Sequence, residues 1–209
     1  MERDEALPVP FFLCRPRAGE SDAGIVVLME GLGISPQLMR FCERLAREGY
    51  LTVAPDLFHR FGGGDPAKPW YTRLRDADAL DDIREAVAEA RRRGARRVGV
   101  TGFCMGGRLT YLTAVSGVDV QAAAPFYGAG IGRNLGAPGC PLLAFFGGKD
   151  EYVPMEEIEA VRAHHAGQVV VYAEAGHGFM RDGSESYRED DAADAWRRLT
   201  TFFTQHLRA

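Results

Sequence analysis

The sequence predicts an α/β fold in which a mostly parallel central sheet is covered by helices on both faces. Apolar, strand-like runs alternate with amphipathic helical patterns along the whole chain, which is typical of parallel strands joined by helical crossovers. Several of these runs are continuously apolar, as expected for strands that are buried on both faces. The length of 209 residues, without a linker or an internal repeat, predicts one domain over residues 1–209.

The N-terminal half supplies three of the expected strands and two of the helices. The strands cover residues 9–15, 24–29 and 51–54. Pro10 interrupts the first strand and favours a place near the sheet edge. Apolar residues recur at helical spacing over 38–45 and again over 80–90, so we expect an amphipathic helix in each stretch. The glycine- and proline-rich segment 59–70 has the length of a lid or a pocket wall.

The C-terminal half continues the alternation. The expected strands cover 98–101, 121–127, 141–146 and 168–173, and the expected helices cover 108–116 and 155–165. A closing helix carries a core-facing stripe formed by Trp196, Leu199, Phe203 and Leu207.

A glycine-rich turn after the strand at 98–101 carries one nucleophilic side chain. The turn reads Gly102-Phe-Cys-Met-Gly-Gly107, which is the nucleophile-elbow pattern G-x-S-x-G with Cys104 in place of serine. Because the tip of such a turn is strained and backbone passes close by, a Cβ at Gly102 or Gly106 would clash. We expect Cys104 to project over the helix N-terminus, where the helix dipole favours a thiolate. A small buried cysteine is the alternative interpretation.

Two other expected strand ends carry the partners that a catalytic cysteine needs. Asp150 follows the strand at 141–146, and His177 follows the strand at 168–173. In open α/β sheets, catalytic and ligand-binding residues lie at the carboxyl ends of the strands. The chain order nucleophile, acid, histidine is that of the α/β-hydrolase triad. His177 would take the thiol proton, and Asp150 would hold the imidazole in the useful tautomer.

Composition and charge narrow the classes of function. A net charge of −4 argues against a nucleic-acid binder. The four cysteines form neither a C-x-x-C pair nor a metal-ligand spacing, so we expect no metal site, no disulfide scaffold and a reducing cytoplasm. The N-terminus lacks the apolar core of a signal peptide, and no apolar run reaches membrane-spanning length. Both a monomer and a homodimer fit the sequence.

From about Gly24 through His206, the chain resembles the dienelactone hydrolase family of α/β-hydrolases. The matching segments are Glu30-Gly-Leu-Gly33, Pro55-Asp56-Leu57, Gly102-Phe-Cys-Met-Gly-Gly107, Phe126-Tyr-Gly128, Gly148-Lys-Asp-Glu-Tyr-Val-Pro154 and Gly176-His-Gly-Phe-Met-Arg181. The resemblance implies an α/β-hydrolase fold and a triad of Cys104, His177 and Asp150. It also implies that Glu30 contacts the resting thiol and takes part in forming the thiolate.

The backbone N–H of Met105 is expected to form half of an oxyanion hole, because it follows the nucleophile. By resemblance, the N–H of Gly31 supplies the other half.

The resemblance further implies a cofactor-free hydrolase that acts on small, anionic lactones or esters through an acyl-thioenzyme. Arg181 matches one of two arginines that hold the substrate carboxylate in the family, and a guanidinium can bind a carboxylate through two hydrogen bonds. For the second arginine the candidates are Lys68, Arg73 and Arg75, without a clean match. Tyr127 is a candidate wall of the substrate pocket.

Two other functions fit the same sequence. A general esterase or thioesterase of this fold would have a broad apolar pocket without converging arginines. A non-catalytic binding or redox-sensing protein would keep the fold but hold Cys104 out of reach of His177.

Overall fold

The central feature of the fold is a seven-stranded sheet that is parallel except for one edge strand. A computed structural model describes residues 9–16, 22–62, 69–165 and 167–208. Across the sheet the strands lie in the order β1-β3-β2-β4-β5-β6-β7. The strands are β1 (Phe11–Cys14), β2 (Ala23–Leu28), β3 (Leu51–Pro55), β4 (Arg97–Phe103), β5 (Ala122–Phe126), β6 (Ala144–Gly147) and β7 (Val169–Tyr172). β1 runs antiparallel to β3 at the sheet edge, and the other pairs are parallel. The predicted fold class and the edge position of the first strand are confirmed.

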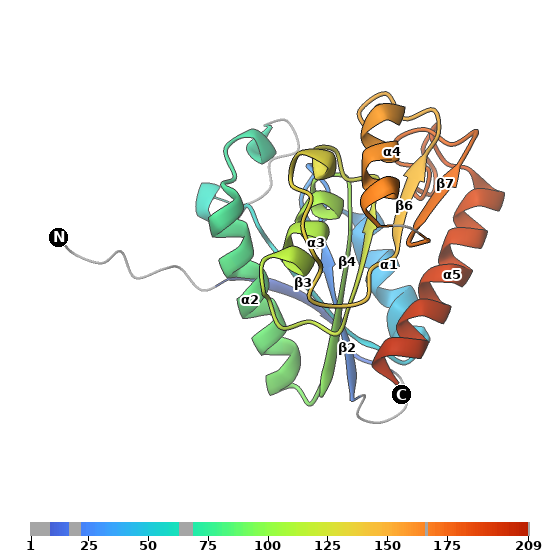
Figure 1. The fold of residues 1–209 in the computed structure, drawn as a ribbon. Helices are drawn as coiled ribbons and strands as arrows, with labels where there is room; N and C mark the ends of the chain where they lie inside the picture. Colours follow the sequence, from blue (N-terminus) through green and yellow to red (C-terminus); the bar gives the residue numbers. More distant parts are fainter. Residues whose placement is uncertain (1–8, 17–21, 63–68, 166, 209) are drawn as a thin grey trace.

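Helices cover both faces of this sheet (Figure 1). They are α1 (Pro36–Arg47), α2 (Asp76–Arg92), α3 (Met105–Val115), α4 (Met155–His164) and α5 (Glu189–Leu207). Gly24 of β2 faces α2, since a Cβ there would lie 3.4 Å from Ala90 Cβ. Gly99 of β4 faces the opposite side, where a Cβ would lie 2.7 Å from Phe203 of α5. None of the helices in the described ranges is long and apolar enough to cross a bilayer.

An aromatic cluster joins α1, α5 and the end of β4. The Phe41 ring packs edge-on against Phe103 at 4.7 Å and against Trp196 at 5.4 Å between ring centroids. Edge-to-face aromatic pairs contribute about 0.5–1.5 kcal/mol each beyond the area that they bury. Because Phe103 directly precedes Cys104, this cluster fixes the strand end that carries the candidate nucleophile.

A tight loop after β2 positions Glu30 and Gly31. Gly33 adopts a left-handed φ of 79°, and its N–H donates to the Glu30 carbonyl oxygen at 3.1 Å. Ser35 then caps α1 by accepting a hydrogen bond from the Leu38 N–H at 3.3 Å. A side-chain cap of this kind satisfies one of the free N–H groups at a helix start. The loop therefore holds Glu30 at the carboxyl end of the sheet.

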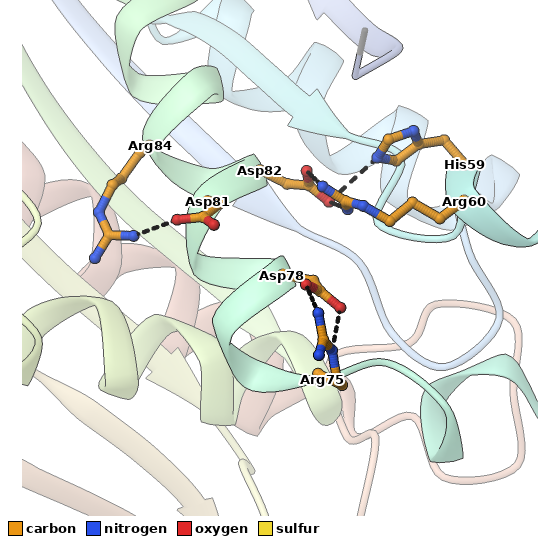
Figure 2. Close-up of polar contacts among 7 residues, drawn as sticks. All are labelled: His59, Arg60, Arg75, Asp78, Asp81, Asp82 and Arg84. Carbon is orange, nitrogen blue, oxygen red and sulfur yellow. Dashed lines mark hydrogen bonds and ion pairs between the residues drawn. The ribbon is translucent and has the colours of Figure 1, made fainter. Parts of the chain in front are cut away.

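The two described ends of segment 59–70 are anchored to the body of the protein. Arg60 donates two hydrogen bonds to the buried Asp82 of α2, and His59 Nε2 lies 3.3 Å from the same carboxylate (Figure 2). Phe61 and Trp70 stack at 5.4 Å with an interplanar angle of 11°. The predicted lid lies partly outside the described residues, because 63–68 are among those that the structure does not describe.

Candidate active site

Cys104 lies at the tip of a sharp turn between β4 and α3. Its backbone has φ 54° and ψ −116°, and Tyr127 is the other described non-glycine residue with positive φ. Such conformations are strained and persist where the surrounding structure holds them. A Cβ on Gly106 would lie 2.4 Å from the Leu28 carbonyl oxygen, and a Cβ on Gly102 would lie 2.5 Å from the Gly106 oxygen. The predicted close approach of backbone at both glycines is confirmed.

His177 and Asp150 form a hydrogen-bonded pair beside this turn. His177 Nδ1 lies 2.9 Å from Asp150 Oδ2. Asp150 Oδ1 accepts the backbone N–H groups of Tyr152 at 2.8 Å and Val153 at 3.1 Å. The buried carboxylate thus has protein donors in place of water. The imidazole also interacts with the Cys104 side chain, and both residues line the same pocket, so the residues from three strand ends lie together.

The surroundings of His177 favour its charged form. Burial would lower the pKa of His177, because desolvation penalises a charged ring. The hydrogen bond to Asp150 and the interactions with Cys104 outweigh burial and raise the pKa of His177 from 6.5 to about 9. At neutral pH the ring is therefore an imidazolium facing sulfur.

Glu30 and Arg181 form an ion pair at the wall of the site. Arg181 donates from its Nη2 at 2.8 Å and from its Nε at 3.2 Å, both to Glu30 Oε2. The carboxylate is nearly buried, with 10% of its side chain exposed, whereas the guanidinium is about one-third exposed. Pairing offsets the cost of burying the Glu30 charge at a strand end. The sequence placed both residues at the site but did not predict that they pair.

Cys104 opens into a pocket of about 630 Å³. The pocket is lined by Glu30, Gly31, Leu32, Pro69, Tyr71, Cys104, Met105, Arg108, Ala129, Tyr152, His177 and Arg181. Met105 is the first residue of α3, so its N–H has no acceptor within the helix. The two residues predicted for the oxyanion hole, Met105 and Gly31, both line this pocket.

Tyr127 lies beneath the imidazole and is 1% exposed. Its ring centroid is 5.0 Å from that of His177, with the planes at 62°. Burial raises the pKa of Tyr127 well above its usual range, and the Glu30 carboxylate adds to the rise. Tyr127 is thus placed to support His177 from behind, and it is absent from the residues that line the pocket at Cys104.

Three cationic residues were the candidates for a second contact with the substrate carboxylate. Lys68 is outside the described residues. Arg73 lies over the rings of Phe61 and Trp70, at 5.3 Å and 5.2 Å from their centroids. Arg75 is exposed and donates to Asp78 at 2.7 Å. Neither arginine is among the residues lining the pocket.

Arg108 lines the pocket instead, and the sequence analysis did not single it out. Its guanidinium donates two hydrogen bonds to Asp76 at the start of α2, one of them at 2.9 Å. Arg108 follows Cys104 by four residues, which is about one helical turn. That spacing after the nucleophile is the signal that could have found it.

Comparisons with known proteins place this chain in a known family. The model of the dienelactone hydrolase family matches residues 10–207. A Salmonella typhimurium protein named "Putative carboxymethylenebutenolidase" is 32% identical over 226 residues, covering 95% of this chain and 83% of that protein. A carboxymethylenebutenolidase of Rhodococcus opacus is 31% identical over 228 residues, covering 96% of this chain and 87% of that protein.

A crystal structure of a "Putative Dienelactone Hydrolase" from Klebsiella pneumoniae has the same fold. It superposes with a TM-score of 0.85 at 31% identity, covering 96% of this chain and 95% of that one. The family match spans the sheet, the elbow at Cys104 and both partner loops. The chain therefore belongs to the dienelactone hydrolase family and is a hydrolase with the α/β-hydrolase fold.

Proposed function

We propose that this hydrolase opens small lactones and esters of the dienelactone type, preferably anionic ones, through an acyl-thioenzyme. The observation that carries the proposal is the position of Cys104 beside His177 in one pocket, with His177 hydrogen-bonded to the buried Asp150. A nucleophile, a base within reach and a carboxylate that orients the base are the elements of covalent acyl transfer.

Acylation uses the sulfur of Cys104 as the nucleophile. The thiolate forms a bond to the carbonyl carbon, and the carbonyl electrons move onto oxygen. The N–H groups of Met105 and Gly31 donate to that oxyanion, a contribution of about 10²–10³ in rate per donor in acyl-transfer enzymes. When the intermediate collapses, the bond to the leaving oxygen breaks and that oxygen takes the proton of His177. An acyl thioester on Cys104 remains.

Deacylation returns the enzyme to its starting state. Water attacks the thioester carbon, the bond to sulfur breaks, and the sulfur departs as a thiolate. For an ordinary ester, neutral His177 takes the proton of the attacking water, so the imidazolium forms again. For a dienelactone, the enolate released by ring opening is basic enough to assist in removing that proton.

The charges in the pocket favour an anionic substrate. Arg181 and Arg108 both line it, and each guanidinium has N–H groups beyond those used by its carboxylate partner. A substrate carboxylate that competes for Arg181 would loosen the bond to Glu30. The freed Glu30 could then accept the Cys104 proton, in line with the role that the family resemblance gives it. Tyr127 would act by supporting His177.

A general carboxylesterase or thioesterase is the second candidate. It is favoured by the apolar pocket mouth and by the pairing of Arg181 with Glu30, which offsets the positive charge. A non-catalytic binding or redox-sensing protein is disfavoured, because it predicts Cys104 out of reach of His177, and these side chains interact and line the same pocket.

The test compares the wild type with Cys104→Ala on cis- and trans-dienelactone and on p-nitrophenyl acetate. Cys140→Ala is the matched control, since Cys140 is a half-buried free thiol outside the pocket. Lactone opening that is lost only in Cys104→Ala supports the proposal, and Arg181→Met should then raise KM for the lactone more than for the neutral ester. Turnover of the neutral ester without the lactone favours the general esterase. A wild type no faster than Cys104→Ala on all substrates supports the non-catalytic alternative.

The domain organisation and the cellular compartment are two further parts of the proposed function. We infer that residues 1–209 form one domain and that the protein works in the cytoplasm, where a thiol nucleophile stays reduced. The four free cysteines support this compartment.

A further inference from the structure

The mouth of the pocket is lined by large hydrophobic side chains that are exposed to solvent. Among the described residues, the exposed large hydrophobics are Leu32 at 47%, Tyr71 at 52%, Tyr152 at 68% and Met155 at 44%. All of these except Met155 line the pocket at Cys104. Exposed apolar side chains gathered around a reactive group are characteristic of a ligand-binding surface.

The size and the lining of the pocket indicate which kind of ligand it accommodates. Its volume of about 630 Å³ lies within the range of roughly 300–1,000 Å³ that accommodates drug-sized ligands. The charged side chains Glu30, Arg108 and Arg181 and the aromatic side chains Tyr71 and Tyr152 line the same cavity. A ligand that uses both kinds of contact has a polar part and a flat apolar part.

The two tyrosines contact the two halves of the catalytic machinery. The Tyr152 ring lies 4.8 Å from the His177 ring, with the planes at 60°, and the Tyr152 N–H holds the Asp150 carboxylate. The Tyr71 ring covers Gly31, where an added Cβ would lie 3.0 Å from Tyr71 Cδ1. Tyr152 thus belongs to the imidazole side of the site and Tyr71 to the oxyanion side.

We propose that the pocket mouth is a subsite for the planar, conjugated leaving group of the substrate, such as the aryl group of an aryl ester, with Tyr152 as its main wall. The inference rests on the proposed function, because it takes Cys104 as the nucleophile. When the bond from the carbonyl carbon to the leaving oxygen breaks, that oxygen takes the proton of His177. The leaving group must then lie beside the imidazole, where the Tyr152 ring is. Tyr71 contacts the other edge of the same group.

A pair of acetate esters separates this binding from the reactivity of the leaving group. Phenyl acetate is compared with a fluoroalkyl acetate whose alcohol has nearly the acidity of phenol, and each enzymatic rate is divided by the rate with hydroxide. Tyr152→Leu removes the ring, Tyr152→Phe keeps it, and Met155→Ala removes an exposed apolar side chain outside the pocket. Because Tyr152 also contacts His177, a loss common to both esters reports on the imidazole. Only the ratio between the two esters reports on the subsite.

We expect the wild type to favour the aryl ester and Tyr152→Leu to lower that preference about three- to tenfold, the effect of losing an aromatic contact. Tyr152→Phe and Met155→Ala should keep the wild-type ratio, and Tyr71→Leu should lower it by a smaller factor. Equal ratios in the wild type and Tyr152→Leu would overturn the proposal. The proposal would also be overturned if light scattering showed a dimeric wild type and a monomeric Tyr152→Leu variant. The exposed tyrosines would then belong to a contact between two copies of the chain.

Binding without turnover distinguishes failure of the subsite from failure of the proposed function. The probe is 4-nitrophenol, with cyclohexanol as its non-planar counterpart, added to Cys104→Ala and followed by chemical-shift changes. Binding of 4-nitrophenol that is weakened by Tyr152→Leu supports the subsite even if no ester is hydrolysed. Ester hydrolysis in the wild type together with equal binding of both probes would reject the subsite and leave the proposed function intact.

Discussion

Replacing Asp150 by asparagine should disable the proposed triad while leaving its shape intact. Asp150 Oδ1 accepts two backbone N–H groups, from Tyr152 and Val153, and Oδ2 faces His177 Nδ1. In Asp150→Asn the amide oxygen would stay with the two backbone donors. The amide NH₂ group would then face Nδ1, which could accept its hydrogen bond but no longer donate. The proton of the neutral ring would move to Nε2, so the ring could not accept a proton from Cys104.

The size of the effect follows from the tautomer and from the lost charge. An equivalent Asp→Asn change in a serine protease triad lowers kcat by about 10⁴, and we expect about 10²–10⁴ here because a thiol needs less help from a base. The pKa of His177, about 9 in the wild type, should fall, because the hydrogen bond to Asp150 is the largest of the effects that raise it.

Two measurements check this reasoning. Steady-state hydrolysis of p-nitrophenyl acetate gives the rate, and the pH titration of the His177 ring protons by NMR gives its pKa. Asp119→Asn is the control, because Asp119 is 72% exposed and pairs with Arg91 at 2.7 Å. An Asp150→Asn variant with more than about a tenth of the wild-type rate and an unchanged His177 pKa would refute the assigned role.

Three further predictions concern stability. Because the pKa of His177 is raised from 6.5 to about 9, protonation of this ring stabilises the folded state. This contribution to the free energy of unfolding is complete below pH 6.5 and is lost as the pH rises toward about 9. In urea titrations at a series of pH values, His177→Gln should abolish this loss. Gly106→Ala should cost about 3 kcal/mol or more, because its Cβ meets backbone at 2.4 Å, whereas Gly139→Ala, with its nearest atom at 3.6 Å, should cost little. Asp82→Ala should cost about 1–3 kcal/mol, because it removes the buried carboxylate that accepts hydrogen bonds from Arg60 and faces the buried His59 ring. Asp81→Ala, on the exposed face of the same helix (Figure 2), should cost less than about 1 kcal/mol. If thermal denaturation shows that Gly139→Ala destabilises the protein as much as Gly106→Ala, the steric argument is wrong. If Asp81→Ala destabilises it as much as Asp82→Ala, the electrostatic argument is wrong.

The fold and the positions of the three proposed triad residues could be predicted because local sequence determines them. Continuous apolar runs define buried parallel strands, and in such a sheet the strand ends share one edge. Cys104, Asp150 and His177 each follow such a strand, so their meeting was a consequence of the topology. The steric need for Gly102 and Gly106 was also local, since both flank the nucleophile.

The pairing of side chains across the site could not be predicted in the same way. Glu30 and Arg181 lie 151 positions apart, and the length of the loop between Gly176 and Arg181 does not determine where the guanidinium points. Arg108 was missed because the helix after the elbow was analysed for its apolar positions. Arg73 and Arg75 have the right charge, but aromatic stacking and a local carboxylate hold them elsewhere.

The proposed thiol nucleophile and the aromatic mouth of the pocket impose the same requirement on the substrate. A thiolate leaves a tetrahedral intermediate more readily than an alkoxide does, since the unperturbed thiol pKa is about 8.5. The intermediate therefore returns to the substrate unless the other leaving oxygen is also stabilised. His177, whose pKa the Asp150 carboxylate holds above its usual range, is a better-matched acid for a phenol-like oxygen, whose pKa is about 10, than for a far more basic alkoxide. A planar, conjugated leaving group satisfies this requirement electronically, and Tyr152 beside the imidazole favours the same group by contact.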